Sequence, residues 1–262
     1  MRLSVSRVER WRRDPYGLYA RSILGLDPLD PLEADLGAAD RGSALHEALD
    51  EFLKAHPSGR LPPDALQRFE ALGERHLADI LAAPAERAFW WPRFQRLARW
   101  FVATENARRA NGARLLGSET KGSVIVGGMT IEAIADRIDD RGDGTWDVID
   151  YKTGRVPSKK ELDALFAPQL LLEAAMAARG GFEKVKGTPK SVAISYWQAN
   201  GLDIVVHRYG HRLVEVTGPC RAEDGVGELG VGHQRCTFRN FYSGFKKFLN
   251  VRISPLTKII PD

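Results

Sequence analysis

The sequence predicts an α/β fold with a helical elaboration at its N-terminal end. Apolar residues recur at helical spacing up to about residue 110. From about residue 113 the pattern changes to short runs rich in β-branched residues, separated by glycine-containing turns. One further helical segment stands between two groups of these runs. Helices followed by strands, a helix and more strands are typical of an α/β core.

The composition is that of an ordinary soluble protein. With 262 residues, 44% of them hydrophobic and 27% charged, the chain can bury a sizeable core. No apolar run approaches the roughly 20 residues that span a bilayer, and the first residues lack the apolar stretch of a signal peptide. Cys220 and Cys236 are the only cysteines, which argues against a disulfide framework and against a four-cysteine metal site. We therefore expect a reduced, cytoplasmic setting and no membrane partner.

The charge of the chain permits a polyanionic partner without requiring one. The net charge is +4 and the isoelectric point is near 9.1. Residues 217–262 hold seven Lys or Arg against four Asp or Glu, so this segment carries +3 of that excess. Charge alone does not identify a nucleic-acid enzyme here.

The N-terminal part is predicted to be mainly helical. Ser4 or Ser6 can cap a first helix that runs toward Asp14, where Pro15 favours a break. A loop is expected over residues 26–40, which are rich in Pro, Asp and Gly.

Three more helices follow in this part of the chain. Asp40 or Ser43 is the expected N-cap of an amphipathic helix, and two further helices are predicted over residues 63–82 and 87–109. We expect the apolar residues of the first and last of these to pack against the rest of the fold: Leu45, Leu49, Phe52, Leu53, Trp90, Trp91, Phe94, Leu97, Trp100 and Phe101.

A three-stranded meander is predicted next. Residues 123–127, 130–138 and 146–152 have the length and composition of strands, and residues 127–128 and 141–144 carry the glycines of turns.

A helix over residues 167–179 then leads to a hairpin of residues 191–198 and 202–208, around the favoured two-residue turn Asn200–Gly201. We divide the chain accordingly into a helical part, an α/β core and a C-terminal tail: residues 1–112, 113–216 and 217–262.

The candidate chemistry lies on two neighbouring strands of the meander. Side chains alternate between the faces of a strand, so Asp150 and Lys152 share one face while Ile149 and Tyr151 share the other. If the two strands pair through their turn, Asp136 comes near Asp150. Two carboxylates and an ammonium group then converge at one edge of the sheet.

This set of groups suits phosphodiester hydrolysis. Carboxylate oxygens bind Mg²⁺, which lowers the pKa of a bound water, and Lys152 can position the nucleophile or stabilise charge on the phosphate oxygens. Taken alone, the pattern has a simpler interpretation, in which Asp136 and Asp139 flank a turn and Lys152 is a solvated strand end.

The surrounding sequence resembles the RecB-like branch of the PD-(D/E)XK nucleases. The resemblance rests on residues 128–139, residues 146–154, the segment around His46 (residues 41–49) and the segment around Gln169 (residues 168–174). It implies a restriction-endonuclease-like core, in which a mixed sheet is flanked by helices.

The resemblance also implies roles for individual residues. His46, Asp136 and Asp150 are the expected metal ligands, for Mg²⁺ or also Mn²⁺, and Asp136, Asp150, Lys152 and Gln169 are the expected catalytic set. Tyr151 is open to core packing or to DNA contact, and Glu132, on the Asp136 face, is a spare candidate.

Residues 3–24 more specifically resemble the start of the C-terminal nuclease domain of alphaproteobacterial AddB-type subunits, and the likeness covers roughly residues 1–200. Such subunits belong to helicase–nucleases of double-strand break repair. The likeness implies exonuclease action on a single DNA strand delivered by an AddA-like partner. Some relatives carry an iron–sulfur cysteine before the proline, but Asp14 stands there in this chain, so we expect no cluster. The chain has no Gly-x-x-x-x-Gly-Lys-Ser/Thr loop, so nothing in it supports ATP binding.

Two alternatives to this function remain open: a non-catalytic DNA-binding or partner-docking module with the same fold, and a stand-alone nuclease with another DNA substrate. The tail is either a single-strand-binding segment, through its aromatic and basic residues 238–248, or an atypical terminus that packs poorly. We favour the second interpretation of the tail.

Overall fold

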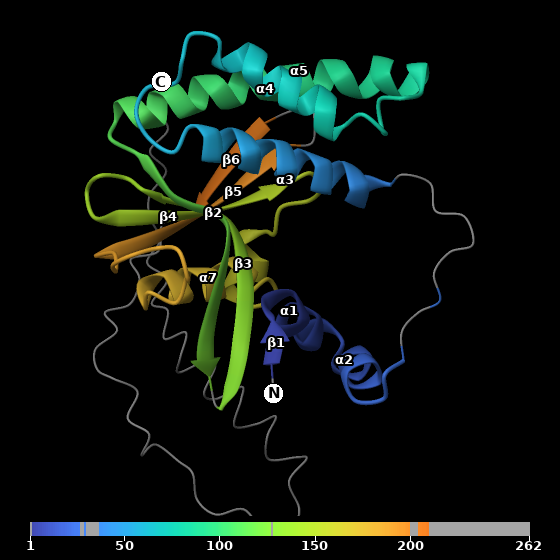
Figure 1. The fold of residues 1–262 in the computed structure, drawn as a ribbon. Helices are drawn as coiled ribbons and strands as arrows, with labels where there is room; N and C mark the ends of the chain where they lie inside the picture. Colours follow the sequence, from blue (N-terminus) through green and yellow to red (C-terminus); the bar gives the residue numbers. More distant parts are fainter. Residues whose placement is uncertain (1, 27–28, 30–36, 127, 200–203, 210–262) are drawn as a thin grey trace, which may run out of the picture.

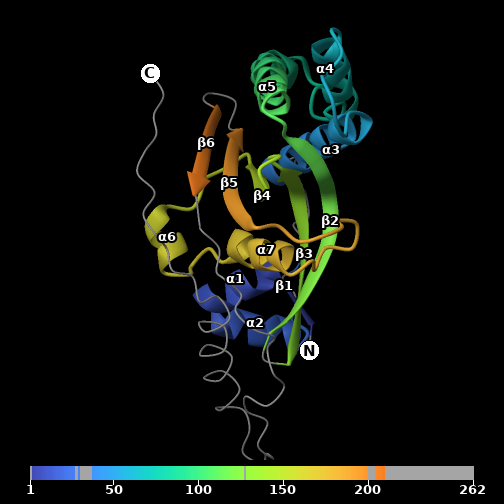
Figure 2. The same ribbon diagram turned by 90° about the vertical axis from the view of Figure 1, so that its left-hand side faces the viewer.

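The fold is one mixed β-sheet with helices on both faces, as expected. The computed structural model describes residues 2–26, 29, 37–126, 128–199 and 204–209. The strands follow the order β1-β3-β4-β5-β6, and β2 pairs with β3. In Figure 1, α3, α4 and α5 lie on one side of the sheet and α1 and α7 on the other. Figure 2 shows the long β2–β3 pair extending past α7 and α1.

The N-terminus contributes a strand as well as the expected helix. Strand β1 (Arg2–Ser4) pairs in parallel with β3, and α1 (Val5–Arg13) follows directly. The Ser4 hydroxyl accepts a hydrogen bond from the Arg7 N–H at 3.2 Å and so caps α1. A second helix that the sequence analysis missed, α2 (Pro15–Ser22), starts at once because Asp14 accepts from the Gly17 N–H at 3.0 Å.

The three long helices form a layer of their own. They are α3 (Ala38–Ala55), α4 (Ala65–His76) and α5 (Pro84–Ala110). The prediction that Asp40 or Ser43 is the N-cap of α3 was wrong, because the helix starts earlier, with Gly37 as its N-cap. Asp40 stabilises the first turn from inside the helix, where its carboxylate accepts from the Gly37 N–H at 2.7 Å.

The meander is confirmed, with a longer first strand. It comprises β2 (Arg114–Val126), β3 (Met129–Asp140) and β4 (Thr145–Lys152), each antiparallel to the next. Strand β2 was expected to begin at Ser123. The earlier half of β2 has weak strand propensity, but its ladder of hydrogen bonds to β3 extends the strand anyway.

The remaining elements complete the sheet. They are α6 (Lys159–Asp163), which was not expected, α7 (Gln169–Ala178), β5 (Ser191–Ala199) and β6 (Ile204–Tyr209). Strand β5 is parallel to β4 and antiparallel to β6, so the hairpin is confirmed and the sheet is mixed. The predicted turn Asn200–Gly201 and the predicted tail 217–262 lie outside the described residues.

The side chains of β4 alternate between two hydrophobic cores, one on each face of the sheet. Trp146 and Val148 pack with α1 and α7 on one face, whereas Ile149 and Tyr151 pack with α3 and α5 on the other. The predicted apolar residues of α3 and α5 join the second core, most of them fully buried and the three tryptophans partly. Among the described helices, none combines the length and the apolar composition needed to cross a membrane.

Candidate active site

The site lies where β3 and β4 separate. Their last paired residues are Arg137 and Ile149, and the same register continued would set Asp136 opposite Asp150. Instead of a backbone ladder, the Tyr151 N–H donates to Asp136 Oδ2 at 2.8 Å. The Asp136 side chain therefore takes the place of the next backbone hydrogen bond between β3 and β4, and the two strands separate at this point.

Asp150 is the most deeply buried of the expected site residues. Its Oδ1 accepts from Lys152 Nζ at 2.9 Å and from Gln169 Nε2 at 3.1 Å. Its Oδ2 is buried and has no hydrogen-bond partner in the described structure. Burial raises the pKa of Asp150 and the Lys152 charge opposes that rise. A buried carboxylate oxygen without a partner is costly, so this atom suits a bound cation.

Lys152 is held at the site. Its side chain is 31% exposed and its ammonium group contacts Asp150. Burial lowers the pKa of Lys152, but the carboxylate of Asp150 more than offsets this and raises it, so the group stays charged. The simpler interpretation of Lys152 as a solvated strand end does not match this geometry.

His46 reaches the site from α3. Its Nε2 lies 3.0 Å from the Tyr151 carbonyl oxygen, and its Nδ1 lies 3.6 Å from Asp136 Oδ2. When Nε2–H donates to the carbonyl, Nδ1 keeps a lone pair directed at the carboxylates. Although burial lowers the pKa of His46, Glu119, Asp136 and the Tyr151 carbonyl together raise it to about 8.

Glu119 is a site residue that the sequence analysis missed. The register pairs Ser118 with Arg137 and Thr120 with Ala135, so Glu119 lies across from Asp136. Ligand atoms of Glu119, Asp136 and His46 all lie within 4.8 Å of one another. Glu119 has φ +43°, an unusual value for a residue other than glycine within a strand. Only the pairing of β2 with β3 could have located it.

Two carboxyl groups at the site resist ionisation. Burial first, and the Asp150 charge second, raise the pKa of Asp136 to about 7. Glu173, on α7, is buried and accepts from Gln169 Nε2 at 3.2 Å. Burial and the charges of Asp150 and Asp136 raise its pKa well above the ordinary value. Glu173 was also missed, although its position one helical turn after Gln169 was a usable signal.

Glu132, the spare candidate, lies elsewhere. It is half-exposed and pairs with Arg2 at 3.0 Å.

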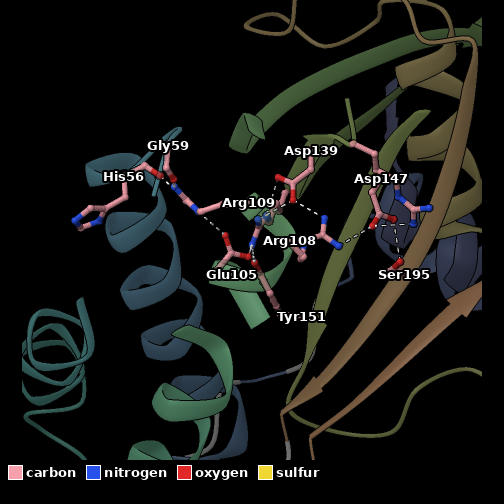
Figure 3. Close-up of polar contacts among 11 residues, drawn as sticks. His56, Gly59, Glu105, Arg108, Arg109, Asp139, Asp147, Tyr151 and Ser195 are labelled. Atoms are coloured by element: carbon pink, nitrogen blue, oxygen red, sulfur yellow. Dashed lines mark hydrogen bonds and ion pairs between the residues drawn. The ribbon is translucent and has the colours of Figure 1, made fainter. Parts of the chain in front are cut away.

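Tyr151 belongs to the core and holds the site through its backbone. Its side chain is 5% exposed, and its hydroxyl accepts from Arg137 Nη1 at 3.3 Å. Arg137 in turn lies 2.6 Å from Glu105 on α5 and 2.7 Å from Asp139. Figure 3 shows this buried network, in which Arg108 also joins Asp139.

The network extends from α5 to the neighbouring strands. Arg108 contacts Asp147, to which the Ser195 hydroxyl donates at 2.9 Å, and Arg109 donates to the His56 carbonyl at 2.6 Å. These contacts fix α5 to the sheet behind Tyr151. The backbone N–H and C=O of Tyr151 are thereby held toward Asp136 and His46.

The donors at this site fit a divalent cation. Asp136, Glu119 and His46 Nδ1 form a compact group, and Asp150 Oδ2 lacks any other described partner. Hard carboxylate oxygens with an imidazole nitrogen suit Mg²⁺ or Mn²⁺. A cation would also relieve the repulsion that raises the pKa of Asp136.

The chain matches a family of known proteins and several curated sequences. A sequence profile of the PD-(D/E)XK nuclease superfamily matches residues 2–225, which include every residue of the site.

Similar curated proteins are an uncharacterized protein of Rickettsia conorii, 32% identical over 189 residues, and one of Rickettsia felis, 30% identical over 213 residues. These matches cover 70% and 78% of this chain but only 22% and 25% of the relatives. Among solved structures, the crystal structure of SSO0001 matches at 18% identity over 68% of this chain and 82% of that chain, with a TM-score of 0.26, a likeness too low to carry an argument. On the profile match, the chain belongs to the PD-(D/E)XK nuclease superfamily.

Proposed function

We propose that this chain is a metal-dependent deoxyribonuclease, acting as the exonuclease domain of an AddB-like, cytoplasmic subunit in double-strand break repair. The observation that carries the proposal is the buried, unpartnered Asp150 Oδ2 beside Lys152 and the group of Asp136, Glu119 and His46. A fold selected for stability alone gains nothing from this arrangement.

Asp136, Asp150, Glu119 and His46 are the residues that would hold the metal, Mg²⁺ or Mn²⁺. Such an ion supplies Lewis acidity and a water of lowered pKa, both of which phosphodiester hydrolysis requires.

The other residues of the site orient the metal-binding carboxylates and control the charge around them. The Lys152 ammonium group offers a positive charge to a phosphate oxygen next to Asp150. Gln169 donates to Asp150 and to Glu173, and so fixes the rotamer of the aspartate. Burial, and then the charges of Asp150 and Asp136, raise the pKa of Glu173 and oppose its ionisation, which limits further negative charge where DNA must approach.

The role in repair rests on the likeness of residues 3–24 to AddB-type subunits. The curated relatives are about four times as long as the matched region, which leaves room for a helicase-like portion in proteins of that kind. We infer a single-stranded DNA substrate delivered by an AddA-like partner. Asp14, which stands where some relatives carry an iron–sulfur cysteine, caps α2 in this chain.

The main alternative is a non-catalytic DNA-binding or docking module. Such a module has no use for an unpartnered buried carboxylate oxygen, and this favours the nuclease. A stand-alone nuclease would differ from the repair subunit in not copurifying with a large helicase subunit.

The test is cleavage of end-labelled single-stranded DNA with Mg²⁺, with Mn²⁺ and with EDTA. We expect cleavage that EDTA abolishes and that Lys152→Ala lowers by at least about 100-fold, the scale of a lost charge-stabilising group. Lys160→Ala, which removes an exposed lysine of α6, is the matched control and should cut like the wild type. Equal cutting by both variants, or no cutting by folded wild-type protein with either metal, would reject the proposal.

A further inference from the structure

A small cavity lies between α3, α5 and the segment that follows β4. Its volume is about 160 Å³, and its walls include Leu45, Phe94 and Leu97, with Thr153 and Gly154 where the chain leaves β4. We propose that this cavity binds one unpaired base of the DNA strand that is cut. This inference rests on the proposed function.

The size of the cavity matches one aromatic ring. Engineered apolar cavities of about 150 Å³ bind benzene, and the lining here is likewise apolar, with Ile80 and Leu77 at its inner side. A paired and stacked base cannot enter such a space, so the ligand must come from a single strand or from an extruded nucleotide.

The opening of the cavity has the aromatic and cationic groups that recognise unpaired nucleotides. Trp90 is half-buried and lines the cavity, and its ring is fixed because Nε1–H donates to Glu86 at 2.7 Å. The Arg41 guanidinium lies 4.4 Å from the centre of that ring, and the Arg93 guanidinium lies 5.8 Å from it. In the described structure neither arginine forms an ion pair with a carboxylate. Aromatic rings with nearby arginines bind single strands by stacking and by phosphate contact.

The cavity is lined in part by the two segments that carry His46 and Lys152. Leu45 precedes His46 on α3, and Thr153 follows Lys152 at the end of β4. Gly42 of α3 lies next to the Thr153 side chain, since a Cβ there would be in van der Waals contact with Thr153 Oγ1, at 3.4 Å. We infer that a base in the cavity brings its strand to the end of β4, at which Lys152 lies.

The charges favour a nucleotide over an apolar peptide. Without a cation the metal-binding group of Asp136, Glu119 and His46 is acidic, whereas Arg41 and Arg93 offer positive charge to a phosphate backbone on the cavity side. An apolar side chain of a partner would not need two guanidinium groups at the rim.

The first variant blocks the cavity from its rim. Ala38 lines the cavity and is exposed on the first turn of α3, so the ring of Ala38→Trp can enter it. Ala39→Trp places the same ring on the same turn at an exposed position outside the lining, and is the matched control. Trp90→Ala removes the stacking ring. Matching thermal unfolding of the two tryptophan variants establishes that both fold alike.

The measurement is the affinity of the full chain for labelled single-stranded DNA, with Ca²⁺ in place of Mg²⁺ to prevent cutting. One abasic residue is moved along the strand. For wild type and Ala39→Trp, we expect one position at which the abasic residue weakens binding about 10-fold, as for loss of one stacked base. For Ala38→Trp and Trp90→Ala, that positional effect should vanish. An effect that persists in these variants, an abasic strand that binds equally at every position, or no binding by the wild type would overturn the inference.

Cutting is then measured separately with Mg²⁺. A positional effect in protein that does not cut would support the base site and reject the nuclease. Cutting without any positional effect would support the nuclease and reject the base site.

Discussion

Replacing Asp136 with asparagine should stabilise the metal-free protein at alkaline pH. The Asp136 side chain is 14% exposed, and burial together with the Asp150 charge raises its pKa from 3.8 to about 7. A carboxyl group whose pKa is higher in the folded state destabilises the fold once the pH exceeds the unfolded value, and the loss grows until the pH passes the folded value. Asparagine keeps an oxygen for the Tyr151 N–H and removes the charge.

The magnitude follows from the two pKa values. At pH 8 the difference between the folded and unfolded pKa of Asp136 lowers the free energy of unfolding of the wild type by about 4 kcal/mol. At pH 5 it lowers this free energy by about 2 kcal/mol. His46 offsets part of this, because Asp136 helps to raise its pKa to about 8. At pH 8 the loss of that contribution subtracts less than about 1 kcal/mol. We therefore expect Asp136→Asn to gain roughly 3 kcal/mol at pH 8 and clearly less at pH 5.

The assay is urea unfolding at pH 5 and pH 8, in EDTA and in Mg²⁺. At a concentration of 100 times its Kd, Mg²⁺ should stabilise the wild type by about 2.7 kcal/mol and should leave Asp136→Asn nearly unchanged. Asp79→Asn, at an exposed position of the α4–α5 connection, is the control and should stay within about 0.5 kcal/mol of the wild type. The reasoning is refuted if Asp136→Asn is less stable than the wild type at pH 8 in EDTA, or if Mg²⁺ stabilises both proteins equally.

Two further substitutions test which side chains around the site affect stability and which affect DNA cutting. Glu173→Gln should change the free energy of unfolding by less than about 1 kcal/mol and preserve cutting, because burial raises the pKa of the native carboxyl and favours its neutral form. A loss of several kcal/mol in urea unfolding would show that the charged form matters. Tyr151→Phe should cost about 1–3 kcal/mol, because a buried donor of Arg137 loses its acceptor. Its DNA cutting should remain, since Asp136 and His46 use the Tyr151 backbone, and a large loss of cutting in the folded variant would contradict this.

Much of the site follows from local rules. Alternation along a strand places Asp150 and Lys152 together, and a short turn brings Asp136 back beside Asp150; both were predicted. His46 and Gln169 come from distant helices, and no periodicity relates them to these strands. They were predicted only through the resemblance of their segments to a known family, and the structure brings both to the site.

Local patterns in the sequence were enough to predict the fold class, the order of most elements and the pair of strands that carries Asp136, Asp150 and Lys152. Periodicity and turn residues act over a few residues, so they suffice for these features. The place of Glu119 in the site could not be predicted in this way, because it depends on the register of β2 against β3 in the folded chain. The role of the Tyr151 backbone also depends on the fold. Because β3 and β4 separate at this point, the Tyr151 N–H is free to donate to Asp136 and its carbonyl oxygen to contact His46. Contacts between distant segments depend on packing and strand pairing across the whole fold, so a local sequence pattern does not predict them.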